Sequence, residues 1–288
     1  MADSQPLTRD SQFAYTCNRC MSCCHDAHVA LDPYEIARLA RNLQLSTTDF
    51  IARYLTEGGI VLRNREDTSC VMLGGDGCTV YPDRPAICRT YPLKRIRTQD
   101  DEVFLRYSLP PTSKGMFGND GTASNYLKSH DVDELFAIKD RYFDLAARMT
   151  AALSDAVKRK PQLFATIRDL IDARCEVNGF KLRRSPNCRQ PGKVPYLIDV
   201  DRAVSDYCRD HKIEFPIAVD KKIKLHIQAI EERLAAISSG SADSSAETGG
   251  LIEMAEFAGA LGAATEFRVL LAFVDGVFGG REPKATSG

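Results

Sequence analysis

The chain has 288 residues, of which 44% are hydrophobic and 27% are charged. That length is ample for a packed core, and both fractions lie near the globular average, so wholesale disorder is excluded. Lysine plus arginine (38) nearly balance aspartate plus glutamate (39), which gives a net charge of −1. Bulk charge therefore argues against a general role in binding nucleic acid or a membrane surface.

The compartment is predicted from what the sequence lacks. The first residues show neither the basic start nor the apolar stretch of a secretory signal. No segment approaches the roughly 20 uninterrupted apolar residues of a membrane span. The nearest candidate, residues 255–280, is interrupted by Glu256, Glu266, Arg268 and Asp275. We therefore expect a cytoplasmic protein, in which clustered cysteines favour metal or redox chemistry over structural disulfides.

Two helices are predicted early in the chain, after a polar lead-in at residues 1–16. Asp32 and Pro33 are a favourable helix start, as N-cap and first-turn proline. Ser46 or Thr47 caps a second helix, which stops at Gly58-Gly59. The apolar faces of the two helices are Ile36, Leu39, Ala40 and Leu43, and then Phe50, Ile51, Tyr54 and Leu55.

Short strands are predicted after the second helix. Residues 60–63 read as one, and residues 70–73 and 78–81 as two more. The intervening Gly74-Gly75-Asp76-Gly77 favours a tight turn, so the last two strands are expected to form a hairpin.

A second hairpin is predicted around Asp100-Asp101, leading into Val103, Phe104 and Leu105. Residues 110–125 follow and are rich in proline, glycine, serine and asparagine. We expect them to be irregular connecting structure.

From about Leu127 the pattern becomes helical. The first long helix presents Leu135, Ile138, Tyr142, Leu145, Ala146 and Met149 on one face. Further helices are expected at residues 161–177, 199–211, 217–237 and 251–278, with a flexible linker at 238–250. The last carries an apolar stripe of Phe257, Leu261, Ala264, Phe267, Leu271 and Val274.

The predicted fold class is mainly α with a small irregular β-hairpin element. A cysteine-rich metal-binding N-terminal half, residues 1–135, would pack on a helical C-terminal half, residues 136–288.

The strongest chemical signal is a run of four cysteines within eight residues, Cys17-x2-Cys20-x2-Cys23-Cys24. Two intervening residues let a tight turn direct successive sulfurs at one centre, as in zinc knuckles and ferredoxin-type clusters. Adjacent Cys23 and Cys24 cannot easily bind the same ion with relaxed geometry. They are expected to serve one metal each, or one of them is a free thiol.

Three more cysteines follow downstream, in the pattern Cys70-x7-Cys78-x9-Cys88. Seven potential thiolates exceed the four of a single tetrahedral site. The count therefore favours a polynuclear or cluster site, or two sites, although some of the seven could be inert buried thiols.

Together these pieces resemble the CxxCxxCC cysteine-cluster family, also called YkgJ-like and described as a zinc- or iron-chelating domain. The resemblance covers roughly residues 15–135. It is carried by the cysteine run, then Gly77-Cys78-Thr79-Val80-Tyr81, Arg84-Pro85 and Cys88-Arg89-x-Tyr91-Pro92. It implies a zinc, iron or iron–sulfur centre held by Cys17, Cys20, Cys23, Cys24, Cys70, Cys78 and Cys88. Many members carry a further cysteine in the segment matching 110–115, where this chain has Ser113.

Polar residues close to the cysteines are candidates for supporting roles. Arg89, directly after Cys88, is the best candidate for stabilising an anionic thiolate centre from outside the ligand set. His25 and His28 could complete a Cys/His zinc shell but fit a polar loop better. Three more basic residues follow Arg89 and fit a solvated face, with binding of a small anion as the alternative; they are Lys94, Arg95 and Arg97.

The tyrosines near the cluster and the cysteines outside it are expected to have structural roles only. Tyr81 and Tyr91 are expected to pack around the site and exclude water. The remaining cysteines, Cys175, Cys188 and Cys208, have no partner at short range, and we leave them out of the site even though His211 follows Cys208 closely.

Three functions stay open. The first is a metal-binding protein whose centre is iron–sulfur or iron, with zinc as the alternative. The second is a protein-modifying enzyme, because flagellin lysine-N-methylases are similar in cysteine pattern; no dinucleotide, P-loop, HExxH or radical-SAM signature accompanies it. The third is a zinc-stabilised module that docks a protein partner. The sequence predicts no catalytic residue and no oligomeric state.

Overall fold

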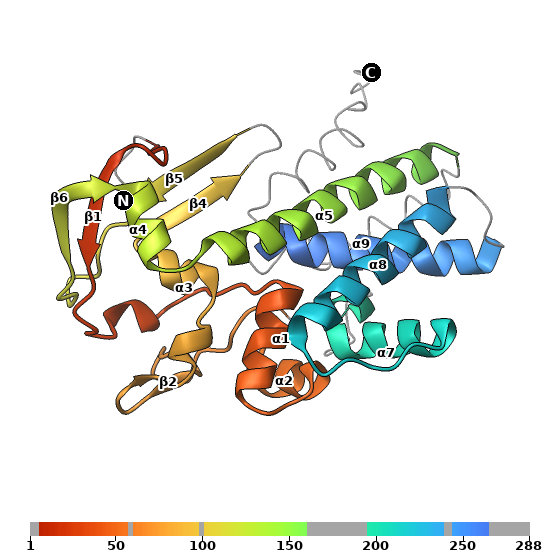
Figure 1. Cartoon of the computed structure of the whole chain (residues 1–288), viewed down its shortest axis with the longest axis horizontal. Helices are drawn as coiled ribbons and strands as arrows, with labels where there is room; N and C mark the ends of the chain where they lie inside the picture. Colours follow the sequence, from red (N-terminus) through yellow and green to blue (C-terminus); the bar gives the residue numbers. More distant parts are fainter. Residues whose placement is uncertain (1–5, 57–59, 98–100, 160–194, 239–243, 265–288) are drawn as a thin grey trace, which may run out of the picture.

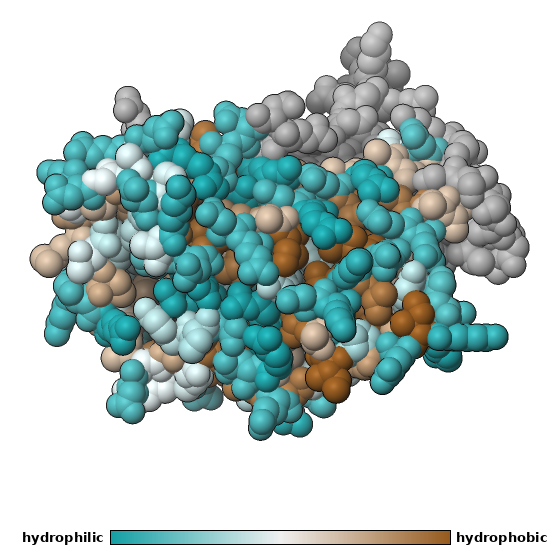
Figure 2. Space-filling model, in the orientation of Figure 1, coloured by the Kyte–Doolittle hydropathy of each residue, from teal (hydrophilic) through white to brown (hydrophobic). Residues whose placement is uncertain are grey.

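The fold of the chain is mainly helical with small antiparallel strand pairs, which confirms the predicted fold class (Figure 1). The computed structural model describes residues 6–56, 60–97, 101–159, 195–238 and 244–264. Strands β1, β4, β5 and β6 gather at one end, and the long helices lie at the other. Within these ranges no helix is long and apolar enough to cross a membrane. Hydrophilic side chains cover most of the face shown in Figure 2.

Both early helices begin where their capping residues predict. Helix α1 spans Pro33–Asn42, and the Asp32 carboxylate accepts a 2.8 Å hydrogen bond from the Glu35 backbone N–H. Helix α2 spans Thr47–Tyr54, and the Ser46 hydroxyl accepts from the Asp49 N–H at 3.0 Å. These caps satisfy backbone donors that the first helical turn leaves unpaired. Helix α2 already ends at Tyr54, whereas the predicted stop at Gly58 lies outside the described residues.

The predicted hairpins are present, although the first is shorter than expected. Strands β4 (Leu93–Arg97) and β5 (Glu102–Arg106) pair in full register, so the second prediction is confirmed. Strands β2 (Leu73–Gly74) and β3 (Gly77–Cys78) form the first hairpin around Gly75-Asp76.

Two of the predicted strands differ from the structure. The predicted strand at 78–81 gives way to a 3₁₀ turn, η2, at Tyr81–Asp83, because Pro82 favours the first turn of a helix. Residues 60–63 form isolated bridges, Val61 to Ala30 and Leu62 to Leu55, instead of a strand.

Two segments predicted to be irregular form a sheet. Strand β1 (Gln12–Thr16), from the predicted lead-in, pairs antiparallel with β6 (Met116–Thr122), from the predicted connecting segment. Every residue of β6 is exposed or half-buried, so it lacks the apolar alternation by which a strand is recognised. Helix α4 (Ala123–Ser129) then begins at a Thr122–Asn125 capping box.

The C-terminal helices pack into a common core. Helix α5 spans Asp133–Arg159, α7 Val200–His211, α8 Val219–Ser238 and α9 Ser244–Ala264, with a 3₁₀ turn, η4, at Tyr196–Ile198. Helix α9 begins inside the predicted 238–250 linker, so that prediction was wrong from Ser244 onward. The predicted α5 face is buried at Leu135, Tyr142, Leu145, Ala146 and Met149, and Ile138 is half-buried.

Other predictions for this region are confirmed or fall on residues that the structure does not describe. The helices expected at 199–211 and 217–237 correspond to α7 and α8. Phe257 and Leu261 of the predicted stripe are buried in α9. The helix expected at 161–177 and the stripe residues Phe267, Leu271 and Val274 lie outside the described residues.

The cysteine-rich part is fastened to the C-terminal helices through the starts of α2 and α7. The Thr47 and Thr48 hydroxyls each donate to the Asp199 carboxylate at 2.6 Å. The Asp201 N–H of α7 donates to the Thr47 hydroxyl at 2.8 Å, and the Thr47 N–H of α2 donates to the Asp201 carboxylate at 2.8 Å. Each helix therefore helps to cap the other. The boundary predicted between residues 135 and 136 falls in the first turn of α5, and that division stays a prediction.

Acid is expected to destabilise this core through His226, which is fully buried. Its Nε2–H donates to the Leu197 carbonyl at 3.0 Å, so Nδ1 accepts from the Tyr142 hydroxyl at 2.8 Å and the ring is neutral. Burial lowers the pKa of His226 to about 4. The stabilisation that neutral His226 contributes is fully present above the pKa of histidine in the unfolded chain, about 6.5. It is lost as the pH falls to about 4, which lowers the free energy of unfolding by about 3 kcal/mol.

Urea unfolding at several pH values checks this expectation. The His226→Gln variant should be less stable at pH 7 and should lose that part of the acid sensitivity. Exposed His211→Gln is the matched control. Equal pH dependence in the wild type and His226→Gln would contradict the assignment.

Candidate metal centre

The two groups of cysteines lie side by side because their backbones pair. The Cys70 N–H donates to the Cys24 carbonyl at 2.7 Å, and the Asp26 N–H donates to the Thr68 carbonyl at 3.0 Å. These bonds lay the segment after the cysteine run antiparallel to the segment before β2. Cysteines 46 residues apart in sequence are thereby held together by main chain.

The β2–β3 hairpin and a short helix bring in the other two downstream cysteines. Cys78 pairs with Leu73 across the hairpin, and the Leu73 N–H returns to the Cys70 carbonyl at 2.9 Å. Cys88 lies in helix α3 (Ala86–Thr90). Glu35 of α1 fixes the start of α3, because its carboxylate accepts the Ala86 N–H at 2.7 Å.

Five of the seven predicted ligands act on one another electrostatically: Cys23, Cys24, Cys70, Cys78 and Cys88. Burial, and then the charges of Cys70 and Cys78, raises the pKa of the Cys88 thiol. The pKa of Cys24 is raised by its hydrogen bond to Cys23 and by burial. Several thiolates in one place repel one another, and a bound cation would remove that penalty. Cys23 is nevertheless exposed, so a metal could reach its sulfur.

Cys20 occupies a different environment, in which its thiolate is favoured. The Lys114 backbone N–H donates to its sulfur at 3.3 Å. This bond, with further donation from Ser22, lowers the pKa of Cys20 to about 6. Ser113 also contributes to the lowering, so the segment around Ser113 lies against Cys20. A thiolate at neutral pH is the form that binds metal.

The chemistry of the donor set fits zinc or iron, although the sulfurs are not arranged as a closed site. Among the described residues, no three Cys, His, Asp or Glu side chains converge closely enough to hold a metal ion. A set made of thiols is nevertheless the one that zinc and iron–sulfur centres use. The charge of Cys20 acts to raise the pKa of Cys23, so Cys20 lies near the five-cysteine group. The charge of Cys17 acts instead on Tyr15 and Tyr126, so Cys17 lies towards these two tyrosines. The assignment of all seven as ligands stays a prediction.

Arg89, the predicted supporting residue, binds main chain. Its buried guanidinium donates to the carbonyls of Arg84 (3.0 Å), His130 (3.1 Å) and Pro82. It therefore ties the turn before Cys88 to the end of α4. Arg89 shapes the site by holding backbone, in addition to supplying positive charge.

Tyrosines form one side of the centre, and sequence reasoning found only some of them. Tyr91 was expected there, and burial followed by the charge of Cys23 raises its pKa to about 12. Tyr15 and Tyr126 were missed, although both respond to the charge of Cys17. The Tyr126 hydroxyl donates to the Tyr91 carbonyl at 2.6 Å, and the Tyr15 and Tyr91 rings meet edge to face at 6.5 Å. Tyr81 is 39% exposed, so it covers the site less than expected.

The close fit of Tyr15 against Gly115 yields a testable consequence. A Cβ atom on Gly115 would lie 2.0 Å from the Tyr15 hydroxyl oxygen and 2.5 Å from Cζ. Gly115→Ala must therefore displace the ring next to Cys20 and Cys23, and we expect a loss of about 1–3 kcal/mol in urea unfolding, with lower metal retention on dialysis. Gly75→Ala is the control, because nothing lies within 4 Å of its Cβ position. Equal stability of the two variants would contradict this placement of Tyr15.

The remaining candidates lie away from the cysteines or carry other contacts. His25 is exposed and pairs with Ser69 in an isolated bridge, and His28 lines a neighbouring cavity. Cys208 is buried in α7, while the His211 imidazole Nε2 lies 3.1 Å from a Glu232 carboxylate oxygen. Cys175 and Cys188 lie outside the described residues. The expected solvated basic face is instead half-buried, since Arg95 and Arg97 pair with Asp140.

Comparison with known proteins supports the cysteine pattern. Residues 16–107 match the model of the CxxCxxCC family, whose description is "putative zinc- or iron-chelating domain". The match contains all seven clustered cysteines, the β2–β3 and β4–β5 hairpins and α3. No curated protein and no solved structure matches the chain.

Proposed function

Because residues 16–107 match the model of the CxxCxxCC family, whose domain is described as zinc- or iron-chelating, we propose that the protein holds an iron-containing centre through its clustered cysteines. The observation that carries the proposal is the backbone bond between Cys24 and Cys70, which holds two distant cysteine segments side by side. The mutual influence of five thiols on their pKa values agrees with this placement. The proposed ligands are Cys17, Cys20, Cys23, Cys24, Cys70, Cys78 and Cys88, with Arg89 supporting the turn before Cys88.

The number of thiols favours iron over zinc alone. A single tetrahedral zinc ion uses four ligands, whereas the five-cysteine group already exceeds four before Cys17 and Cys20 are counted. Iron–sulfur clusters accommodate more thiolates by holding several metal atoms. The reducing cytoplasm in which we place the protein keeps these thiols available. Zinc remains the alternative cofactor.

Two other functions are outcomes of the same test. In an enzyme of the lysine-N-methylase kind, the centre would lie beside a substrate pocket supplied partly by α5. In a zinc-stabilised binding module, the metal would only hold α3 and the β2–β3 hairpin in place for a protein partner. A cavity lined by residues of both α3 and α5 is consistent with the first of these functions.

The deciding experiment is anaerobic purification, followed by analysis of metal and acid-labile sulfide and an absorption spectrum. We expect iron, sulfide and a brown band that fades on reduction. Colourless protein with stoichiometric zinc and no sulfide would overturn the iron assignment and leave the zinc module.

Single-cysteine variants test the ligand assignment. Cys24→Ser should lower the metal content per chain, because Cys24 lies at the junction of both cysteine groups. Cys208→Ser is the matched control, since that thiol is buried in α7 and lies near the Glu214 carbonyl. Unchanged metal content in Cys24→Ser would remove Cys24 from the ligand set.

A further inference from the structure

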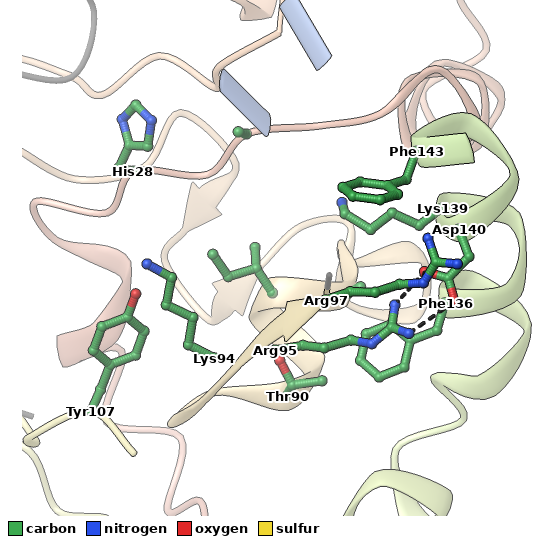
Figure 3. Close-up of a pocket in the computed structure, with 13 residues that line it drawn as sticks. His28, Thr90, Lys94, Arg95, Arg97, Tyr107, Phe136, Lys139, Asp140 and Phe143 are labelled. Carbon is green, nitrogen blue, oxygen red and sulfur yellow. Dashed lines mark hydrogen bonds and ion pairs between the residues drawn. The ribbon is translucent and has the colours of Figure 1, made fainter. Parts of the chain in front are cut away.

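A cavity of about 200 Å³ lies on the side of α3 that carries Ala86, Ile87 and Thr90 (Figure 3). Strand β4, helix α5 and the segment around Ala30 supply its other walls. Cys88 is not among its lining residues, so the cavity is separate from the candidate metal centre although both use α3.

Apolar side chains from three parts of the chain make up much of the wall. Ala86 and Ile87 come from α3, Phe136 and Phe143 from α5, and Ala30 from the segment before α1. An apolar cavity of roughly 150 Å³ binds benzene. The space here is therefore sufficient for an apolar group about the size of one ring.

The arginines in the wall are already bound to carboxylates. Arg95 binds both carboxylate oxygens of Asp140, at 2.7 and 2.9 Å, and also pairs with Glu102. Arg97 pairs with Asp140 at 3.5 Å and with Asp144 at 3.0 Å. These pairs fix the position of the side chains and balance most of their charge.

The lysines in the wall also have contacts of their own. The Lys139 ammonium lies 3.5 Å from the Asp32 carboxylate and 3.4 Å from that of Glu35. At the far end of the cavity, the Lys94 ammonium lies 5.8 Å from the centre of the Tyr107 ring. A charged ligand would have to give up its hydration and compete with these existing contacts. The wall therefore favours an uncharged ligand.

Thr90 supplies the polar group that the fold itself does not use. It is only 2% exposed, yet none of the described residues forms a hydrogen bond with its hydroxyl. Every fully enclosed side-chain nitrogen and oxygen in the described part of the chain has a partner, so this hydroxyl must open onto free space, and the space that Thr90 lines is the cavity. Figure 3 shows its oxygen directed towards the other lining side chains.

The chemistry of a buried hydroxyl defines the matching group on a ligand. Leaving such a hydroxyl without a partner costs free energy, which a hydrogen bond inside the cavity recovers. A hydroxyl both donates and accepts, so it suits the oxygen of another hydroxyl or of a carbonyl.

We propose that this cavity binds a small uncharged molecule with an apolar body of about one ring and one hydroxyl or carbonyl oxygen. The oxygen forms a hydrogen bond with the Thr90 hydroxyl. The body lies against Ile87, one helical turn from Thr90, and against the aromatic side chains of α5. A single polar group placed in an apolar cavity is typical of small-molecule sites. Such binding requires no particular metal at the cysteines.

Thr90→Val tests the site, because it keeps the shape of the side chain and removes its hydroxyl. Calorimetric titration of the protein as purified, with its metal, uses phenol as the probe, toluene as the probe without an oxygen, and benzoate as the charged probe. We expect saturable binding of phenol, which Thr90→Val weakens about tenfold while toluene binding changes by less than about twofold. Benzoate should bind the wild type about tenfold more weakly than phenol, or worse.

Thr90→Ser is the matched control, since it retains the hydroxyl and should bind phenol within about twofold of the wild type. The metal content of each variant, measured in parallel, should equal that of the wild type, which separates loss of phenol binding from loss of the centre. Should Thr90→Val lose metal, the wild-type preference for phenol over benzoate still decides. Equal phenol binding by the wild type and Thr90→Val, benzoate binding as tight as that of phenol, or no saturable binding of phenol would overturn the proposal.

Discussion

Removing the metal from the purified protein is expected to unfold the cysteine segments while the C-terminal helices stay folded. Thiol-bound structural metal contributes on the order of 10 kcal/mol to folding, because a preformed site rarely exists in the unfolded chain. Without it, Cys23, Cys24, Cys70, Cys78 and Cys88 are held in mutual repulsion once they ionise. The segment from η1 (Ser22–Cys24) to α3 carries this cost.

Hydrogen exchange before and after chelation locates the effect. The amide of Cys70, which is bonded to Cys24, should lose its protection, whereas amides within α5 and α8 should keep theirs. Those helices have buried faces of their own, including Tyr142, Met149 and Ile230, and so provide the internal control. Retained protection at Cys70 and across α3 after the metal has left would show that the centre is not needed for folding.

Local signals explain why much of the helical fold is predictable. The starts of α1 and α2 depend on side chains within three residues of the cap, Asp32 to Glu35 and Ser46 to Asp49. The β4–β5 hairpin likewise joins strands that are adjacent in sequence, with its Arg97–Glu102 pair next to the turn. Such contacts can be inferred from a short window of sequence.

The β1–β6 pair could not be predicted in the same way, because its partners are about 100 residues apart. Gln12 meets Thr122 and Thr16 meets Met116, and polar residues and glycines dominate β6. With most of both strands exposed or half-buried, no clear apolar alternation marks them. The only pattern signal was the Thr122–Asn125 capping box at the start of α4, which already limits how far an irregular segment can extend.

In the site, as in the fold, local contacts could be predicted from the sequence and distant contacts could not. Spacing was enough to identify Cys17 to Cys24 as one group, since a tight turn brings them together. Tyr15 and the Lys114 N–H reach Cys20 only through the β1–β6 pairing, so their roles were invisible in the sequence. Arg89 was chosen for its charge and its place beside Cys88, but its observed partners are carbonyls on a turn and on α4. The hydrogen-bond partners of such a side chain depend on the assembled fold.

A buried ion cluster connects the cysteine-rich part to α5 and is expected to carry the second large effect. Glu35 accepts the Ala86 N–H that begins α3, returns a capping bond to Asp32, and lies 3.4 Å from the Lys139 ammonium of α5. Asp32 lies 3.5 Å from the same ammonium. Lys139 is thus the shared cation of two carboxylates that are both almost fully buried.

Lys139→Met should cost about 3–5 kcal/mol in urea unfolding at pH 7, because it leaves two buried carboxylates without their cation. Burial and the charge of Glu35 already raise the pKa of Asp32 to about 6, and loss of the lysine raises it further. A carboxyl with a raised folded pKa favours the folded state when protonated, so its stabilising contribution is lost as the pH rises through that pKa. The variant should therefore recover part of its stability at pH 5.

Adding Asp32→Asn, which retains the helix cap, should restore stability at pH 7 as well. Exposed Lys128→Met should change stability by less than about 0.5 kcal/mol. If Lys139→Met were as stable as Lys128→Met, or equally unstable at pH 5 and pH 7, the cluster would not be the electrostatic link between α1, α3 and α5.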